Sequence, residues 1–139
     1  VTKMSARLRF AGYKARGIHL AVSYRDGSFW HKGVSFESIV FDTRDIYKRA
    51  FRILSSSPYE KPVRELAVSC FNLIKSGSSQ LYLFEDVVKK EKLASSIDEI
   101  NERWGDFVVT PARMLGTKGY VPDRIAFGGV KELEEFTLA

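Results

Sequence analysis

The sequence has little of the chemistry from which metal sites and nucleophilic active sites are built. Only one cysteine and two histidines occur among its 139 residues, too few for a Cys/His metal cluster or a Cys-His nucleophile pair. A single cysteine also excludes an internal disulfide, and Cys70 stands in an alternating apolar run where a small buried side chain is the simplest interpretation. We therefore expect a reducing, cytoplasmic setting and no metal site.

Long apolar runs and glycine-rich phosphate loops are also missing. No stretch approaches the roughly 18 residues of a transmembrane helix, no signal-like segment opens the chain, and FGGVK lacks the spacing of a P-loop or dinucleotide turn. The acidic groups fit helix ends and solvated surfaces better than a magnesium pair. These groups are Asp42 with Asp45, Glu85 with Asp86, and Glu132 to Glu135. We expect no membrane contact, no catalytic residue and no cofactor within this chain.

The residues that are present give a formal net charge of +5. This excess permits a polyanionic partner, although an ordinary solvated surface also accounts for it. A chain of 139 residues fits one domain with its own core. We expect residues 1–110 to form that domain and residues 111–139 to form a loop-rich, partly ordered tail. Because the chain begins at Val1 directly in a helical pattern, we interpret it as a piece cut from a longer polypeptide.

Apolar periodicity predicts helices and strands in alternation. Period-two runs on either side of Asp26-Gly27 indicate a hairpin. Asp42 or Thr43 is a suitable helix cap, and Gly12 and Gly105 are helix stops. The predicted elements are a helix over 2–11, strands over 18–24 and 30–37, a helix over 45–54, a strand over 63–73, a helix capped by Asp86 that ends at 104, and a short strand over 107–109. This order predicts an α+β fold with one sheet of about four strands and helices on one face.

The two faces of this sheet carry different side chains. Branched, aromatic and other apolar residues would face the helices, namely Ile18, Leu20, Val22, Val34, Phe36, Leu66, Val68 and Cys70. The opposite face would present small residues, namely Ala21, Ser23, Gly33, Ser35, Ala67 and Ser69, with Lys3, Arg25, His31, Lys32 and Arg64 around them. Small side chains let phosphate oxygens reach backbone amides and hydroxyls, so this face suits a nucleic-acid backbone. The alternative is that the rest of a longer chain covers it.

A second unusual feature is the segment SSQLYLFED at 78–86. It places Leu81, Leu83 and Phe84 between a turn-like stretch, IKSGSS, and a charged helix. Water is a poor environment for three large apolar side chains. Either they cover an end of the domain's own core, or they fill a pocket on a partner.

Five blocks of the sequence together resemble the C-terminal little finger domain of Y-family translesion DNA polymerases. They are ARLRFAGYKARGIHLAVSY, DTRDIYKRAFRIL, KPVRELAVSCFNL, QLYLF and LASSIDEINERWG, in the family's order and at its spacing between residues 3 and 110. The closing DRIAFGGVKELEEF looks most like the UmuC-like, UV-damage-repair branch of Gram-positive bacteria. The resemblance implies the little finger fold.

The resemblance also implies a function. Such a domain holds the backbone of primer-template DNA without reading its sequence, inside an error-prone polymerase of DNA damage repair and the SOS response. The catalytic carboxylates and their Mg²⁺ would belong to the palm domain of the parent chain, which also has fingers and thumb domains. The residues that we assign to DNA binding are Lys3, Arg25, His31, Lys32, Ser35, Arg64, Ala67 and Ser69.

QLYLF is similar to the peptide by which bacterial replication proteins bind the sliding clamp. The similarity assigns Gln80 to hydrogen bonds with the clamp, and Leu81, Leu83 and Phe84 to its hydrophobic pockets. The alternative function is therefore a protein-interaction module that recruits its parent protein to the clamp.

Overall fold

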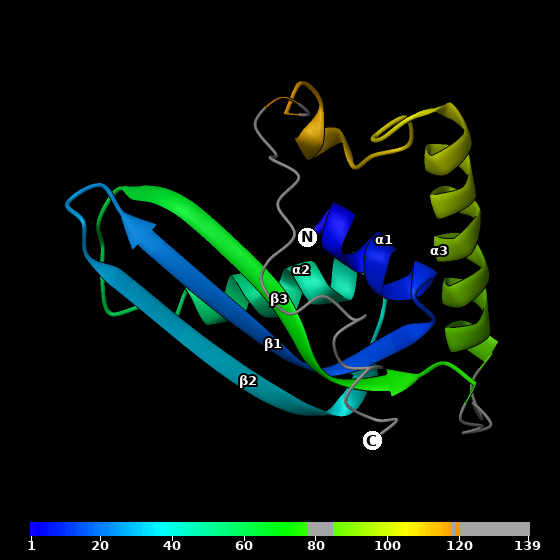
Figure 1. Cartoon of the computed structure of the whole chain (residues 1–139), viewed down its shortest axis with the longest axis horizontal. Coiled ribbons are helices and arrows are strands. Elements are labelled where there is room, and N and C mark those ends of the chain that lie inside the picture. The colour runs from blue at the N-terminus through cyan, green and yellow to red at the C-terminus, as the bar shows by residue number, and fades with distance from the viewer. Residues whose placement is uncertain (78–84, 118, 120–139) are drawn as a thin grey trace, which may run out of the picture. The chain divides into compact units, whose positions relative to one another are not determined.

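The computed structural model describes residues 1–77, 85–117 and 119. Its elements in chain order are α1 (Thr2–Phe10), β1 (Tyr13–Tyr24), β2 (Phe29–Val40), α2 (Thr43–Leu54), β3 (Val63–Lys75), α3 (Glu85–Trp104) and the 3-10 helix η1 (Ala112–Met114) (Figure 1). The chain divides into two compact units, Val1–Ser95 and Ser96–Ala139. The first unit contains the three-stranded sheet and the helices α1 and α2. The predicted α+β class is therefore confirmed.

The sheet is antiparallel, with β1 in the centre and β2 and β3 on either side (Figure 1). The predicted hairpin of β1 and β2 is confirmed. In its turn the Asp26 carboxylate accepts hydrogen bonds from the Ser28 amide at 3.0 Å and the Ser28 hydroxyl at 2.6 Å. Gly27 has a φ of 83°, a left-handed conformation that glycine adopts without steric cost. A turn this short sets the register of the two strands, which is constant from Ser23 to Gly17 of β1 and shifts between Gly17 and Ala15.

The ends of the helices follow the sequence signals. The Asp42 carboxylate accepts hydrogen bonds from the amides of Arg44 and Asp45 at 3.0 and 3.1 Å, so it caps α2 as expected. Glycines with φ of 73° and 108°, Gly12 and Gly105, follow the ends of α1 and α3. These local signals fix where the helices end, but packing on the sheet supplies most of their stability.

The core lies between one face of the sheet and the helices α1 and α2. Ile18 and Val22 of β1 and Ile46 of α2 are completely buried, and burial of each such side chain contributes about 1.5 to 3 kcal/mol. The two helices are also tied together, because the hydroxyls of Ser5 and Thr43 lie 2.7 Å apart. We call this side of the sheet the covered face; it is the face that the alternation of apolar residues predicts.

Two sequence predictions are wrong. Residues 107–109 form no strand: Phe107 has a φ of 68°, which interrupts extended backbone. The Asn101 side chain donates to the Val109 carbonyl at 3.0 Å and accepts from the Val109 amide at 2.8 Å, so the groups that a neighbouring strand would use bond to a side chain instead. Within the described residues the sheet therefore has three strands rather than four. Likewise α3 begins at Glu85, so Asp86 lies inside its first turn instead of capping it.

Candidate nucleic-acid interface

The face of the sheet opposite the core is built from small side chains in register. On β1, Ala21 stands opposite His31 of β2 and Ala67 of β3. Residues directly opposite each other in an antiparallel pair share a face. We call this side the open face; its members are Gly17, His19, Ala21 and Ser23 of β1, Phe29, His31, Gly33 and Ser35 of β2, and Glu65, Ala67, Ser69 and Phe71 of β3. The register therefore brings four of the expected site residues, His31, Ser35, Ala67 and Ser69, to one side, and all four are exposed.

A row of rings crosses the open face, and sequence reasoning missed it. Nε2 of His19 lies 3.1 Å from Nδ1 of His31, and the His31 ring centroid lies 5.7 Å from that of Phe29. At the other end the Phe71 ring lies over glycine: a Cβ on Gly17 would come within 2.5 Å of it. In a neutral pair one ring donates this bond and the other accepts it, so the accepting ring carries its proton on its second nitrogen and can donate it to an anion.

The expected cations do not all gather on the open face. Arg25 lies in the turn between β1 and β2, and its amide donates to the Pro62 carbonyl at 3.0 Å. Arg64 is exposed at the start of β3, where the register with β1 shifts. Both residues stand at the end of the sheet that holds the hairpin turn. They could reach a polyanion that lies along the open face.

Two of the expected residues lie elsewhere. Lys32 stands opposite Leu20 and so belongs to the covered face, where its Nζ donates to the Ser56 hydroxyl at 3.1 Å. Lys3 lies on α1, one of the helices that pack against that face. The open face also carries an acidic residue, Glu65, opposite Ser23. Its positive field is therefore weaker than the cations of the sequence suggest.

Residues 1–83 match the impB/mucB/samB family C-terminal domain. The chain belongs to this family. It is the C-terminal domain of Y-family DNA polymerases, so the resemblance drawn from the five sequence blocks is confirmed.

Curated relatives of this Y-family domain are named as DNA polymerases. The chain is 33% identical to DNA polymerase IV 2 of Bacillus subtilis over 125 residues, which are 86% of this chain and 30% of that protein. It is 27% identical to DNA polymerase IV of Pelotomaculum thermopropionicum over 119 residues, 85% of this chain and 30% of that protein. It is 30% identical to DNA polymerase IV of Desulfatibacillum aliphaticivorans over 118 residues, which are 81% of this chain and 30% of that protein. The chain spans about 30% of the length of these relatives.

Metal ions require sets of donor side chains that lie close together. Among the residues that the structure describes, no three of His, Cys, Asp and Glu come together in a way that could hold a metal ion. In the same residues, none of the helices combines the length and the apolar character needed to cross a bilayer.

Cys70 lies on the covered face of the Y-family domain, opposite Ile18. Its Sγ is 3.4 Å from the Met4 Sδ, and burial raises the pKa of the Cys70 thiol to about 11. The thiolate is the reactive form, so this thiol is unreactive at neutral pH. The interpretation of Cys70 as a small apolar side chain in the core fits this environment.

The clamp-like segment falls outside the residues that the structure describes. Gln80, Leu81, Leu83 and Phe84 all lie between 78 and 84. Whether they cover this domain's core or bind a partner therefore stays a prediction.

Proposed function

We propose that this domain holds primer-template DNA against its open face by contacts with the phosphate backbone, without reading base sequence. The register of small residues across three strands supports this most directly. Small side chains leave the backbone accessible. Among the described residues β3 is an edge strand of the sheet, so part of its amides point away from β1. Backbone amides and hydroxyls such as that of Ser69 position phosphates but carry no sequence information.

Charge supports a moderate rather than a tight grip. Arg25 and Arg64 stand at the hairpin-turn end of the sheet, and the His19 and His31 rings cross the open face. Glu65 on the same face carries the opposite charge. If about three to five phosphates are neutralised, log affinity falls against log salt with a slope of roughly −3 to −4.5. This domain therefore contributes a salt-sensitive part of the total affinity of a longer protein.

The longer protein that we propose is an error-prone translesion polymerase that acts in the cytoplasm in DNA damage repair and the SOS response. Its palm, fingers and thumb domains would carry out catalysis, with Mg²⁺ on palm carboxylates. The names of the relatives and the family of the matched domain support this proposal. Within the chain we propose a DNA-binding domain over residues 1–110 and a tail over residues 111–139.

A negative charge introduced on the open face tests the DNA-binding proposal. Ser69→Glu puts a carboxylate among the phosphates, and at a separation of about 8 Å and an effective dielectric constant near 20 the repulsion is about 2 kcal/mol. We expect at least a tenfold loss of affinity for labelled primer-template DNA at low salt, measured by fluorescence anisotropy. Ser96→Glu, on an exposed position of α3, makes the same change of charge at a residue outside the three strands and is the matched control. Equal affinities of the two folded variants would contradict the proposal.

The salt dependence distinguishes the two faces. Replacing Arg25 and Arg64 with Ala should make the slope of log affinity against log salt shallower by roughly 1.8, or about 0.9 for each lost phosphate contact. Lys32→Ala should leave the slope unchanged, because Lys32 lies on the covered face. A shallower slope for Lys32→Ala alone would mean that the DNA lies on the other side of the sheet.

A second function, recruitment to the sliding clamp, is supported by the similarity of QLYLF to clamp-binding peptides. We expect an affinity near the micromolar level, about −8 kcal/mol. Replacing Leu83 and Phe84 with Ala should abolish retention on immobilised clamp and leave the melting temperature and the DNA affinity unchanged. If these side chains belong to the core, the same double substitution costs several kcal/mol of stability instead.

A further inference from the structure

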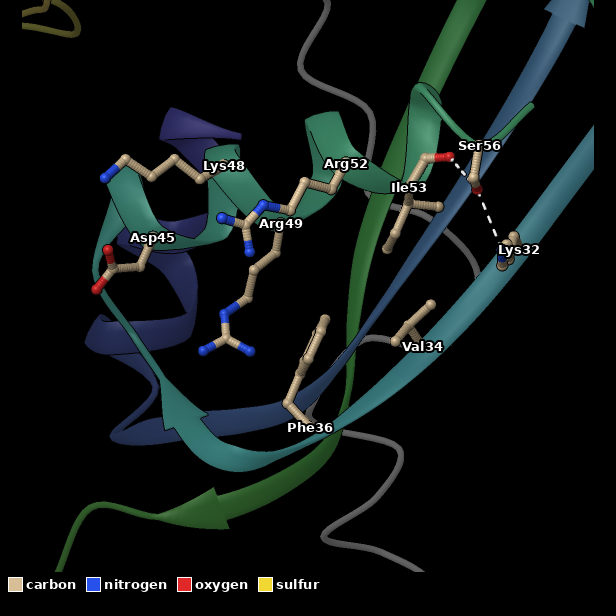
Figure 2. Close-up of a pocket in the computed structure, with 9 residues that line it drawn as sticks. All are labelled: Lys32, Val34, Phe36, Asp45, Lys48, Arg49, Arg52, Ile53 and Ser56. Atoms are coloured by element: carbon tan, nitrogen blue, oxygen red, sulfur yellow. Dashed lines mark hydrogen bonds between the residues drawn. The ribbon is translucent and has the colours of Figure 1, made fainter.

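The covered face is not fully covered at its β2 edge. Between β2 and α2 the structure forms a hollow of about 540 Å³, within the size range of ligand sites. Its floor is apolar: Val34 and Phe36 point from β2 toward α2, and Ile53 points down from α2 (Figure 2). We call this hollow the basic groove, because its walls carry Lys32, Lys48, Arg49 and Arg52. It lies on the opposite side of the sheet from the proposed DNA site.

The positive charge of the basic groove is poorly neutralised. Among the described residues that line it, the only acidic one is Asp45, whose carboxylate already lies 3.1 Å from the Lys90 Nζ. Lys32 and Arg49 bond to neutral partners. Lys32 donates to the Ser56 hydroxyl at 3.1 Å, and Arg49 donates to the Ser38 hydroxyl of β2 at 2.7 Å. Such bonds orient the cations without cancelling their charge.

The Arg49 guanidinium is also held in place by a ring. Its central carbon lies 4.2 Å from the centroid of Phe36, a cation–π arrangement that fixes a planar fork of donors above an apolar floor. Arginine in a fixed orientation is well suited to bidentate bonding with a carboxylate. Lys48 and Arg52 stand on the exposed surface of α2 at the rim of the groove.

These features together favour one class of occupant. The apolar floor calls for a hydrophobic side chain, and the surrounding cations call for carboxylates, a combination that an acidic peptide offers and a nucleic-acid backbone does not. β2 is an edge strand of the sheet in the described residues, so an extended segment can pair with it and present alternate side chains to the groove. We propose that the basic groove binds an extended acidic peptide segment that carries apolar side chains.

The proposal is tested with the whole 139-residue chain and a fluorescein-labelled peptide, Asp-Glu-Leu-Asp-Leu-Glu-Asp. Its alternate positions place two Leu side chains over the floor and an Asp at either end. We expect saturable binding, seen by fluorescence anisotropy, that weakens at least tenfold when both Leu are replaced by Ser. Equal binding of the Ser peptide would overturn the proposal, because the floor would then contribute nothing.

Charge reversal locates the site. Lys48→Glu with Arg52→Glu should weaken peptide binding at least tenfold. Lys89→Glu with Lys92→Glu, on exposed positions of α3, makes the same change of net charge and should weaken it less than about twofold, the residual long-range effect of net charge. Equal weakening by the two pairs would overturn the proposal. So would a loss of primer-template DNA binding in the first pair alone, because the groove would then be a nucleic-acid site.

A measurement on the unaltered chain keeps the test valid if a variant fails to fold. In an isotope-labelled sample, the peptide should shift the amide resonances of β2 from Lys32 to Phe36 and of α2 around Arg49, and leave those of Ala67 and Ser69 in place. Shifts confined to the open face would overturn the proposal.

Discussion

The two faces of one sheet are built by the same strands and differ in almost every property. On β1, Ile18 and Val22 point to the covered face and are completely buried. Their neighbour Ala21 points to the open face and meets another alanine, Ala67, across the strand pair. Burial of apolar area supplies most of the favourable free energy of folding, so most stability is stored on the covered face. The identity of the residues on the open face is therefore less constrained by folding.

The open face is not uniformly permissive, however. Phe71 of β3 stands opposite Gly17 of β1, and its ring occupies the space above Gly17 and reaches toward Gly33. The ring partly fills that part of the face and limits how closely a ligand can approach the backbone. The open face is therefore accessible around Ala21 and Ala67, and it is partly covered near Phe71.

The largest expected effect tests the covered face directly. Ile18→Ala removes a completely buried side chain between the sheet and the helices, and we expect a loss of about 2 to 5 kcal/mol in the free energy of unfolding. Ser69→Ala, on the strand beside it but on the open face, should change stability by less than about 0.5 kcal/mol. Urea unfolding of both variants gives the comparison. Similar losses in the two would mean that stability is shared between the faces.

The next effect sharpens the comparison inside the open face. Gly17→Ala places a methyl group 2.5 Å from the Phe71 ring, so the ring must move, and we expect a loss of about 1 to 3 kcal/mol. The backbone of Gly17 does not have a positive φ, so the cost comes from the ring and not from strain. In a Phe71→Ala background the same substitution should be nearly neutral, which a double-mutant cycle of unfolding free energies measures. Additive losses would contradict the contact.

Much of the fold follows from local patterns. Period-two alternation assigns the apolar and small residues of three strands to the correct faces, and Asp42, Gly12 and Gly105 mark helix ends with side-chain or backbone chemistry that needs no distant contact. The short apolar run at 107–109 misled, because its outcome depends on Asn101, a side chain of another element that takes the backbone bonds. A local pattern does not contain that competition.

The candidate site was less accessible from the sequence. Lys32 is two residues from Val34, so alternation itself places both on the covered face, whereas the prediction placed Lys32 around the small residues of the opposite face. Alternation within single strands does not predict the row of rings, because Phe71 contacts Gly17 only through the register of β3 against β1. The basic groove likewise depends on how α2 lies across β2, which residue spacing does not determine.

A smaller effect concerns Cys70, a covered-face residue that is only partly buried. Burial raises its pKa to about 11 in the folded state, above the usual value near 8.5. The neutral thiol is thus favoured by folding, and this contribution is complete below the unfolded pKa and is lost as pH rises from about 8.5 through about 11. We expect slow labelling by a thiol-specific disulfide reagent at neutral pH that accelerates in this range. Cys70→Ala should show a smaller decrease of stability over the same range.

Rapid labelling at neutral pH in the folded chain, at the rate seen in urea, would show that the covered face is open at Cys70. That result would mean that the helices do not protect the β3 part of the covered face from solvent.

The smallest effect comes from the hairpin turn, which belongs to neither face. There the Lys61 Nζ lies 2.6 Å from the Asp26 Oδ2, and this bond holds the pKa of Asp26 below its usual range and raises that of Lys61. The Asp26 contribution is present above its unfolded pKa of about 3.9 and is lost as pH falls below that. The Lys61 contribution is present below about 10.4 and is lost as pH rises above it. Asp26→Asn keeps an acceptor for the Ser28 amide and removes both the charge and the second oxygen, to which Lys61 donates. Because both groups are exposed and screened by salt, we expect a small fall in melting temperature between these pH values that disappears in high salt. A fall as large as that of Ile18→Ala would mean that the turn, and not the covered face, limits the stability of the sheet.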